Sequence, residues 1–256
     1  MTRLSTLALA LTLGVACATA SFAQEPADPE APADGGGEKE GEEPQAEEPE
    51  SPIAAALARQ LHVDPHYRDG RVELVYTFRE PEEIDDWENR GFQRAEQANA
   101  KGRRKAKVER KNQTLALATS REGILTHKIP FLEDVEVEIT CHVERGATRS
   151  DLVLGVGDAG VRYGQTFVRK SGSGFKPLGA PFAAENPFLG GAKATVTLKA
   201  SGAVFSAQVG KGEAQTTDKL RDKLAGKVFL YTTQAHLVVH RVVIRGAVDL
   251  EKLKLR

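Results

Sequence analysis

Hydrophobic and polar residues alternate most strictly in the segment Val135–Val143, which reads VEVEITCHV. Its odd-numbered positions hold valine, isoleucine and cysteine, and its even-numbered positions hold glutamate, threonine and histidine. Side chains on a β-strand point to opposite faces with a period of two, so this segment has one apolar and one polar face. Its β-branched residues also favour a strand over a helix. We therefore predict a half-buried strand that pairs with others in a sheet.

Short runs with the same period recur from Gly70 onward, separated by glycine, proline, aspartate or asparagine. We predict strands over residues 71–78, 114–119, 123–128, 135–143, 151–157, 161–169, 194–200, 203–209, 227–232 and 237–245. Ser201-Gly202 and Asp158-Ala159-Gly160 are predicted hairpin turns, and residues 220–224 a single helical turn. The prevalence of short strands and hairpin-length connections predicts an all-β fold: a two-sheet antiparallel jelly-roll sandwich over residues 67–256.

Residues 1–23 have the pattern of an export signal. Arg3 supplies a positive charge, residues 4–15 form an apolar stretch too short to span a bilayer, and Ser21-Phe22-Ala23 offers small residues at the cleavage positions. We expect an exported protein, which is periplasmic, bound to the cell surface or secreted. A rival interpretation makes Cys17 a lipidated N-terminus, but the residues before it lack the leucine usual three places upstream.

Residues 24–52 are rich in proline, glutamate and glycine, without aromatic or β-branched residues. Such a segment buries too little apolar surface to offset the entropy of ordering, and its like charges extend it. We predict a disordered acidic linker, followed by a lead-in over residues 53–66. The lead-in begins with a short helix over residues 53–63, with Ser51 as N-cap and Pro52 in the first turn. Asp64-Pro65 ends it.

The charge of the chain is unevenly distributed. There are 35 basic and 36 acidic residues in all. Two of the bases and eleven of the acids precede Ser51, which leaves 33 bases and 25 acids, a surplus of eight positive charges, in residues 51–256. We interpret the acidic linker as a spacer. The alternative is a tail that competes for a basic surface on its own domain.

Basic residues are densest between positions 90 and 111, where a compact sandwich needs only a short connection. Clustered arginine and lysine bind phosphate or sulfate with little dependence on sequence, so this stretch is a candidate site for an acidic polysaccharide or another polyanion. The alternative is a solvated insertion. Phe92 is its only aromatic residue, which argues against nucleic acid as a partner. The candidate binding residues are Arg103, Arg104, Lys105 and Lys107.

Two further features carry a functional and a structural interpretation. Trp87 is the only tryptophan, and aromatic rings stack on sugars, so it joins the candidate binding residues. A core side chain near a strand end is the favoured interpretation of Trp87. Glu136 and Glu138 share a strand face about 6–7 Å apart, near the separations that glycosidases use. The solvated face of an amphipathic strand is the favoured interpretation, so no catalytic residue is assigned.

The remaining chemistry is sparse. Removal of the signal leaves Cys141 alone, on the apolar face of its strand, where it acts as a small hydrophobe. His236 and His240 share a face, but two nitrogens without a further ligand make a poor zinc site. Asp158 is a turn residue or, alternatively, part of a calcium-binding rim. We expect no metal site and no cofactor, and no catalytic-triad, P-loop or dinucleotide motif is present.

Several strand phrases resemble the concanavalin A-like, laminin G-like jelly-roll domains of secreted bacterial proteins, including the 3-keto-disaccharide hydrolase-like and glucanase-like domains. The phrases are FREPEEIDDWE, TLAL, FLEDVEVEI, DLVLGVG and VVIRGAVD, spread over about residues 70–249. The resemblance implies two packed antiparallel sheets and a domain that binds sugars or proteins. It implies no catalytic residue, because the ExDxE triplet of endoglucanase relatives is reduced to Glu136-Val137-Glu138 and the ExQIxD motif is absent.

We therefore predict an exported, non-catalytic binding domain whose ligand is a glycan or a cell-envelope partner. Two alternatives stay open at this point. One is a glycoside-cleaving enzyme of the concanavalin-like hydrolase type, and the other is a structural envelope protein. No transmembrane segment and no nucleic-acid partner are expected.

Overall fold

The computed structural model describes residues 51–91, 93–94, 107–110, 114–119, 122–144, 150–164, 187–188, 191–232 and 235–253. These residues belong to one compact unit, Glu47–Arg256. The predicted signal peptide, the predicted linker up to residue 50 and the end of the predicted strand 161–169 lie outside the described residues.

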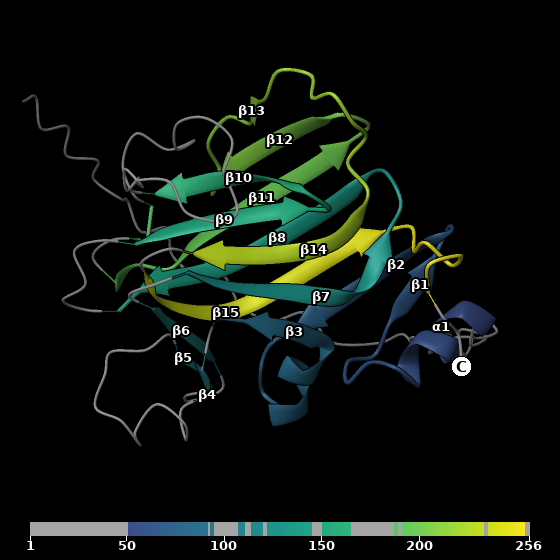
Figure 1. Cartoon of the computed structure of the whole chain (residues 1–256), viewed down its shortest axis with the longest axis horizontal. Helices are drawn as coiled ribbons and strands as arrows, with labels where there is room; N and C mark the ends of the chain where they lie inside the picture. Colours follow the sequence, from purple (N-terminus) through teal and green to yellow (C-terminus); the bar gives the residue numbers. More distant parts are fainter. Residues whose placement is uncertain are drawn as a thin grey trace, which may run out of the picture. The chain divides into compact units, whose positions relative to one another are not determined.

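The strands form two sheets (Figure 1). The ten-stranded sheet runs in the order β13 (Gln215–Thr216), β12 (Val204–Val209), β11 (Ala194–Ser201), β8 (Val135–Val143), β15 (Ala235–Gly246), β6 (Leu115–Thr119), β5 (Lys107–Arg110) and β4 (Gln93–Arg94). In the same sheet, β2 (Arg71–Tyr76) also pairs with β15, and β1 (His66–Arg68) pairs with β2. The five-stranded sheet runs in the order β10 (Ala159–Gly164), β9 (Asp151–Val156), β14 (Gly226–Thr232), β7 (Gly123–Phe131) and β3 (Trp87–Arg90).

The two sheets face each other across one hydrophobic core. In Figure 1, β9, β14 and β7 lie in front of β11, β8 and β15. Val137 from the ten-stranded sheet and Leu154 and Leu230 from the five-stranded sheet belong to the same buried cluster, and each is at most 1% exposed. Every pairing between the described strands is antiparallel except that of β4 with β5. The predicted all-β antiparallel jelly-roll sandwich is confirmed.

The strand β8 has the bounds and the orientation that its pattern predicts. Its odd-numbered residues, from Val135 to Val143, are at most 1% exposed, and the even-numbered ones are partly exposed. Cys141 is fully buried and forms no disulfide, as its place on the apolar face predicts. Burial raises the pKa of its thiol well above the ordinary value, so the thiol stays protonated.

The two predicted hairpins are present, but one turn is shifted by one residue and the other has two residues where three were predicted. Ser201 pairs with Val204, so the turn between β11 and β12 is Gly202-Ala203. Val156 pairs with Ala159, so the turn between β9 and β10 is Gly157-Asp158. Each turn begins with a glycine at positive φ, 54° and 62°, which is the arrangement that a two-residue type II′ turn requires.

The helix α1 (Pro52–Ala58) has the predicted cap, since the Ser51 side chain accepts a hydrogen bond from the Ile53 amide at 3.3 Å. It ends five residues before the predicted end. The amides of Gln60 and Leu61 both donate to the Leu57 carbonyl, which closes the last turn. Leu61 then packs into the sandwich core, only 7% exposed, and draws the chain out of the helix.

The predicted helical turn at residues 220–224 is wrong. The amides of Leu220 and Leu224 donate to the carbonyls of Ala203 and Gly202, in the turn between β11 and β12. This connection therefore satisfies its backbone groups on a neighbouring hairpin and not within a helix. One short helix outside the prediction is the 3-10 helix η1 (Pro81–Asp86), which leads into β3.

Candidate functional site

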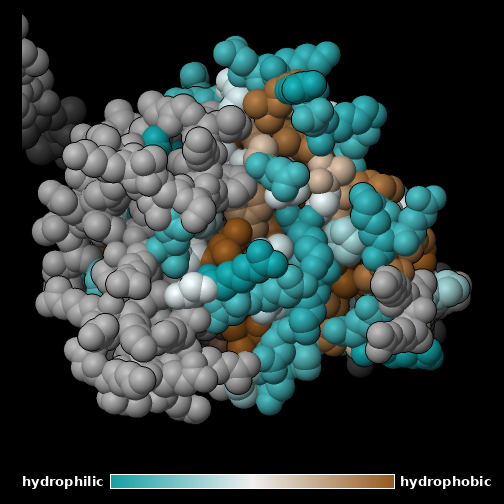
Figure 2. Space-filling model, viewed as in Figure 1, coloured by the Kyte–Doolittle hydropathy of each residue, from teal (hydrophilic) through white to brown (hydrophobic). Residues whose placement is uncertain are grey.

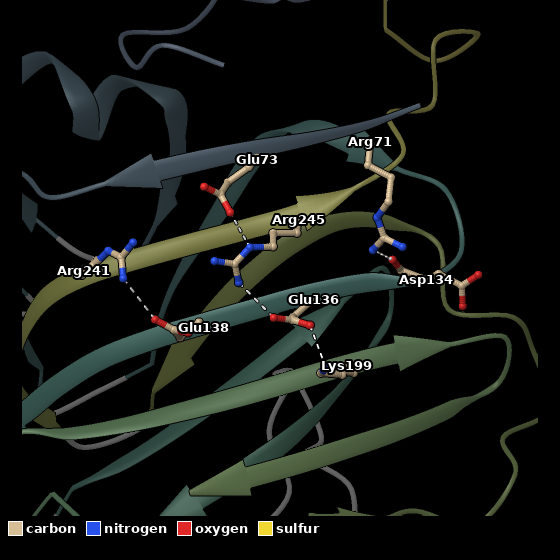
Figure 3. Close-up of polar contacts among 8 residues, drawn as sticks. All are labelled: Arg71, Glu73, Asp134, Glu136, Glu138, Lys199, Arg241 and Arg245. Carbon is tan, nitrogen blue, oxygen red and sulfur yellow. Dashed lines mark hydrogen bonds and ion pairs between the residues drawn. The ribbon is translucent and has the colours of Figure 1, made fainter. Parts of the chain in front are cut away.

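The outer face of the ten-stranded sheet, opposite to the core, carries a row of charged side chains from four strands (Figure 3). We call this row the charge ladder; its members are Glu73 on β2, Arg245 on β15, Glu136 on β8 and Lys199 on β11. The strand registers place each directly opposite the next. Cross-strand neighbours lie about 5 Å apart at Cβ, so an alternation of sign across four strands gives an unbroken chain of ion pairs.

The contacts of the charge ladder are short. Arg245 Nη1 lies 2.9 Å from Glu136 Oε1, and its Nε donates to Glu73 Oε2. Lys199 Nζ lies 2.9 Å from Glu136 Oε2. The carboxylate of Glu136 thus accepts from a cation on each side. Partial burial alone would raise the pKa of Glu136, but Lys199 and Arg245 outweigh burial and hold the pKa below its ordinary value.

The same face continues toward the other end of β8. Arg241 Nη1 lies 3.4 Å from Glu138 Oε1, and the hydroxyls of Thr140 and Thr195 are 2.9 Å apart. Val243, which pairs with Glu138, is fully buried although it points to this outer face. The long side chains around it therefore cover an apolar spot, as arginine stems commonly do.

Beyond the threonines, His142 on β8 and His240 on β15 contact each other. His142 Nδ1 lies 2.7 Å from His240 Nε2, and the ring centroids are 4.9 Å apart. Both side chains are half-buried. Burial first, and then the charge of Lys193 and the neighbouring ring of His142, lower the pKa of His240. We call these two residues the histidine pair.

The charged side chains of this face engage one another and are partly exposed. The side chains of Glu136, Glu138 and Arg245 are 24%, 26% and 34% exposed, so solvent and a ligand reach them. Glu136 and Glu138 are each held by a cation, and the pKa of Glu136 is lowered, whereas a glycosidase acid needs a raised pKa. The interpretation of these two glutamates as the solvated face of a strand is confirmed.

A second polar cluster is buried at the junction of α1, η1 and β3. The carboxylate of Asp86, fully buried, accepts from the backbone amide of His62 at 2.9 Å, from His62 Nδ1 at 2.8 Å and from the Tyr76 hydroxyl at 3.2 Å. The Tyr76 hydroxyl lies 2.7 Å from His127 Nε2. The Ile129 amide donates to His127 Nδ1 at 3.2 Å, so the proton of the neutral ring is on Nε2 and points to Tyr76.

Burial dominates the chemistry of this second cluster. Desolvation lowers the pKa of His127 to about 3, so the ring is neutral at ordinary pH. Burial, followed by the charge of Asp86, raises the pKa of Tyr76 far above its ordinary value. Donors thus run in one direction, from His127 through Tyr76 to Asp86, and the cluster holds the lead-in against the sandwich. The role of this cluster is structural, and among its members only the side chain of His62 is substantially exposed.

Trp87, a sequence-predicted binding residue, lies in this buried region. It is 5% exposed and packs edge-on against Tyr76 and His127, with ring centroids 5.4 and 5.1 Å away. The favoured interpretation of Trp87 as a core residue is confirmed. A ring so enclosed offers no face to a sugar at the surface.

The predicted basic site is largely outside the described residues. Arg103, Arg104 and Lys105 all fall in an undescribed stretch. Lys107 is the first residue of β5 and pairs with Ala118 of β6 and Gln93 of β4. A polyanion site formed by these residues stays a prediction.

Three other residues considered in the sequence analysis, His236, His240 and Asp158, lie in the described part of the chain. His236 and His240 share the outer face of β15, and His236 lies 3.9 Å from Glu144, but the partner of His240 is His142. Asp158 occupies the turn before β10. Within the described part of the chain, no group of three or more histidine, cysteine, aspartate or glutamate residues is arranged to hold a metal ion. No helix among these residues has the length and hydropathy to cross a membrane.

The outer face of the five-stranded sheet differs from the charged face. There Val153, Phe229 and Tyr231 form a separate apolar cluster, and each is at most 3% exposed. Figure 2, viewed from the side of this sheet, shows hydrophobic surface in the middle of the molecule between hydrophilic regions. The described row of partly exposed, hydrogen-bonding side chains lies on the ten-stranded sheet.

No protein-family model matches the sequence, and no curated protein matches it significantly. Among solved structures, the chain is similar to a protein of unknown function with a galectin-like fold from Bacillus subtilis, at 11% identity and a TM-score of 0.46, over 68% of this chain and 94% of that one. It is also similar to the metal-free exoplasmic/lumenal domain of VIP36, at 10% identity and a TM-score of 0.43, over 70% and 92%. The potassium-bound carbohydrate recognition domain of Emp46p matches at 11% identity and a TM-score of 0.41, over 66% and 94%.

Proposed function

We propose that the chain is an exported, non-catalytic binding domain of the concanavalin A-like type that binds an envelope glycan on the outer face of its ten-stranded sheet. The observation that carries this proposal is the charge ladder together with the Arg241–Glu138 pair. These six side chains place hydrogen-bond donors and acceptors in alternation on adjacent strands. Each sugar hydroxyl both donates and accepts, so an alternating array on a rigid sheet suits a row of hydroxyls.

The balance of charge favours a neutral ligand for this face. The charge ladder contains two acids and two bases, and Arg241 and Glu138 cancel each other. A polyanion gains affinity mainly from uncompensated lysine and arginine, which this face lacks among its described ion pairs. A polyhydroxylated, uncharged glycan gains instead from oriented charge-assisted hydrogen bonds.

The non-catalytic part of the proposal rests on the engaged carboxylates. A retaining or inverting glycosidase needs one protonated and one free carboxyl group. Glu136 and Glu138, the pair nearest to that requirement, accept from Lys199, Arg245 and Arg241. The glycoside-cleaving alternative would be favoured instead if the purified chain released reducing sugar from any glycan that it binds.

The test is a glycan-array screen with the purified chain, followed by calorimetry on the best ligand. We expect Arg245→Ala to weaken binding at least about tenfold, because it removes the donor shared by Glu73 and Glu136. The matched control is Lys227→Ala, which breaks an ion pair with Glu88 on the other sheet and should leave affinity unchanged. Melting temperatures confirm that both variants are folded. Equal affinity of Arg245→Ala and its parent, or the absence of any glycan ligand, would overturn the proposal.

A further inference from the structure

The histidine pair has a hydrogen-bonding property that single histidines lack. A contact of 2.7 Å between two imidazole nitrogens needs one proton between them, so one ring donates and the other accepts. A neutral imidazole carries one N–H and one lone pair. If His142 Nδ1 donates, then His142 Nε2 accepts and His240 Nδ1 is protonated. If the roles are exchanged, the outer nitrogens exchange too.

In either arrangement the neutral pair presents one donor and one acceptor on its outer nitrogens. Neither His142 Nε2 nor His240 Nδ1 has a hydrogen-bond partner among the described residues. A donor next to an acceptor is the arrangement that two neighbouring sugar hydroxyls match. The pair lies on β8 and β15, the same strands that supply Glu138 and Arg241 to the outer face.

The first proton added to the pair leaves the bond between the rings but makes both outer nitrogens donors, so the outer acceptor is lost. A second added proton removes the bond as well. When both rings are imidazolium, every ring nitrogen is a donor, the bond between the rings is lost, and the two charges repel. The surrounding groups do not stabilise the extra charge. Glu138 on β8 is held by Arg241 on β15. Glu144, just after β8, lies near His236 on β15, and Lys193 before β11 adds a positive charge.

We propose that His142 and His240 are a proton-dependent part of the glycan-binding face: the neutral bonded pair binds two adjacent hydroxyls of the sugar, a first added proton removes its outer acceptor, and a second opens the pair and releases them. This inference rests on the proposed function. Below the ordinary histidine pKa of about 6.5, acid therefore weakens ligand binding through a defined pair of residues. Lys193 and burial place the opening at a lower pH than that of a free histidine.

The first experiment needs no ligand. Histidine ring resonances are followed by NMR between pH 4.5 and 8 in the parent chain, in His142→Gln and in His236→Gln. We expect His142→Gln to raise the titration midpoint of His240 by several tenths of a pH unit or more, because the neighbouring ring lowers that midpoint. His236 lies on the same strand face outside the pair, so its variant should leave the midpoint of His240 in place. Independent titration of His142 and His240 would overturn the inference.

The second experiment measures affinity for the array-selected glycan at pH 7.5 and pH 5. We expect the parent and His236→Gln to lose at least about fivefold at pH 5, and His240→Gln to bind more weakly at pH 7.5 with little further loss. A parent whose affinity is the same at both pH values would overturn the inference while the proposed function stands. Conversely, coupled titration in the first experiment with no glycan bound at any pH would contradict the proposed function, and with it the ligand-releasing role of the pair.

Discussion

One buried carboxylate, that of Asp86, joins the N-terminal lead-in to the sandwich. It accepts from both the amide and the ring of His62, and the donor series from His127 through Tyr76 ends on it. A neighbouring carboxylate, Glu83, accepts from the amides of Thr77 and Phe78 at 2.8 and 2.7 Å. Phe78 has a φ of 55°, an unusual value for a bulky residue, and Glu83 holds the chain in that conformation.

The neutral state of His127 makes the fold sensitive to acid. Its pKa is about 3 in the folded chain, below the ordinary value of about 6.5, so the unfolded chain takes up the proton first as the pH falls. The stability linked to His127 is therefore greatest above pH 6.5 and is lost progressively toward pH 3. We expect His127→Gln, which can still donate to Tyr76, to reduce the loss between pH 7 and pH 4 by about 3 kcal/mol.

Urea unfolding of the parent and of His127→Gln across this pH range measures that difference. The control is His66→Gln, at an exposed position on β1. Because every other titrating group is common to the two chains, parallel pH profiles for the parent and His127→Gln would show that His127 is protonated in the folded state.

The two faces of β8 predict opposite effects for neighbouring substitutions. We expect Val137→Asp to unfold the domain or to cost at least about 4 kcal/mol, because a charge at a fully buried position has no partner. We expect Glu138→Ala to cost less than about 1 kcal/mol, since its ion pair with Arg241 is partly exposed. Thermal melts of the two variants measure both effects. Comparable shifts in melting temperature would mean that β8 has a different register.

Single residues were predictable where the local pattern alone decides their environment. Burial of Cys141 and the solvated position of Glu136 follow from the period of two within one strand. The charge ladder and the histidine pair were not predicted. Their members come from strands far apart in the sequence, such as His142 and His240, and only the order of the strands brings them together.

At the scale of elements, β15 organises the ten-stranded sheet. It pairs with β8 along one side, and along the other side with β6 in its first half and with β2 in its second half.

In the five-stranded sheet, the ring of Phe229 on β14 lies directly over the backbone of the hairpin formed by β9 and β10. A Cβ atom added at Gly155 would lie 2.1 Å from Phe229 Cζ and 2.3 Å from the carbonyl oxygen of Ala159.

This close approach makes Gly155 intolerant of a side chain. We expect Gly155→Ala to lower the free energy of unfolding by at least about 2 kcal/mol, because both the ring and a strand backbone must move. The control is Gly212→Ala, at an exposed site where the nearest atom to the added Cβ is 3.1 Å away and where we expect a change within about 1 kcal/mol. Urea midpoints measure both changes. If Gly155→Ala lowers the free energy of unfolding no more than Gly212→Ala does, then the ring of Phe229 does not lie over Gly155.

Elements with a sustained pattern were predictable, and those defined by distant contacts were not. The bounds of β8 agree with the alternation of its sequence. The short strands β1, β3, β4, β5 and β13 were missed, since two to four residues carry too little pattern. The predicted end of α1 was wrong because Leu61 packs into the core and the amide of His62 donates to Asp86. No local signal in the sequence indicates either contact.

At the scale of the whole molecule, residues 51–256 carry the positive surplus and the preceding segment carries the negative one. The charge ladder and the Arg241–Glu138 pair together carry no net charge, so they contribute nothing to the surplus. The dense basic stretch at residues 90–111 accounts for much of it.

We predict that this stretch binds sulfated polymers. On a heparin column, changing Arg103, Arg104, Lys105 and Lys107 together to serine should lower the salt concentration needed for elution. With fewer cationic contacts, fewer counterions are released when the chain binds, so binding is weaker. The matched control changes Lys211, Lys219, Arg221 and Lys252, which are exposed in the described part of the chain. If both variants elute alike, the stretch is only a solvated insertion.

The position of β15 has a consequence for the timing of folding. Residues 235–246 are made after every other strand of either sheet, yet they lie at the centre of the larger one. A ribosome adds about 5–20 residues per second, so the completed β2 segment waits on the order of ten seconds for its partner. Until then β2, β6 and β8 have unpaired edges, and a nascent chain halted before residue 235 should remain open to proteases. The larger sheet is therefore completed only when β15 joins it.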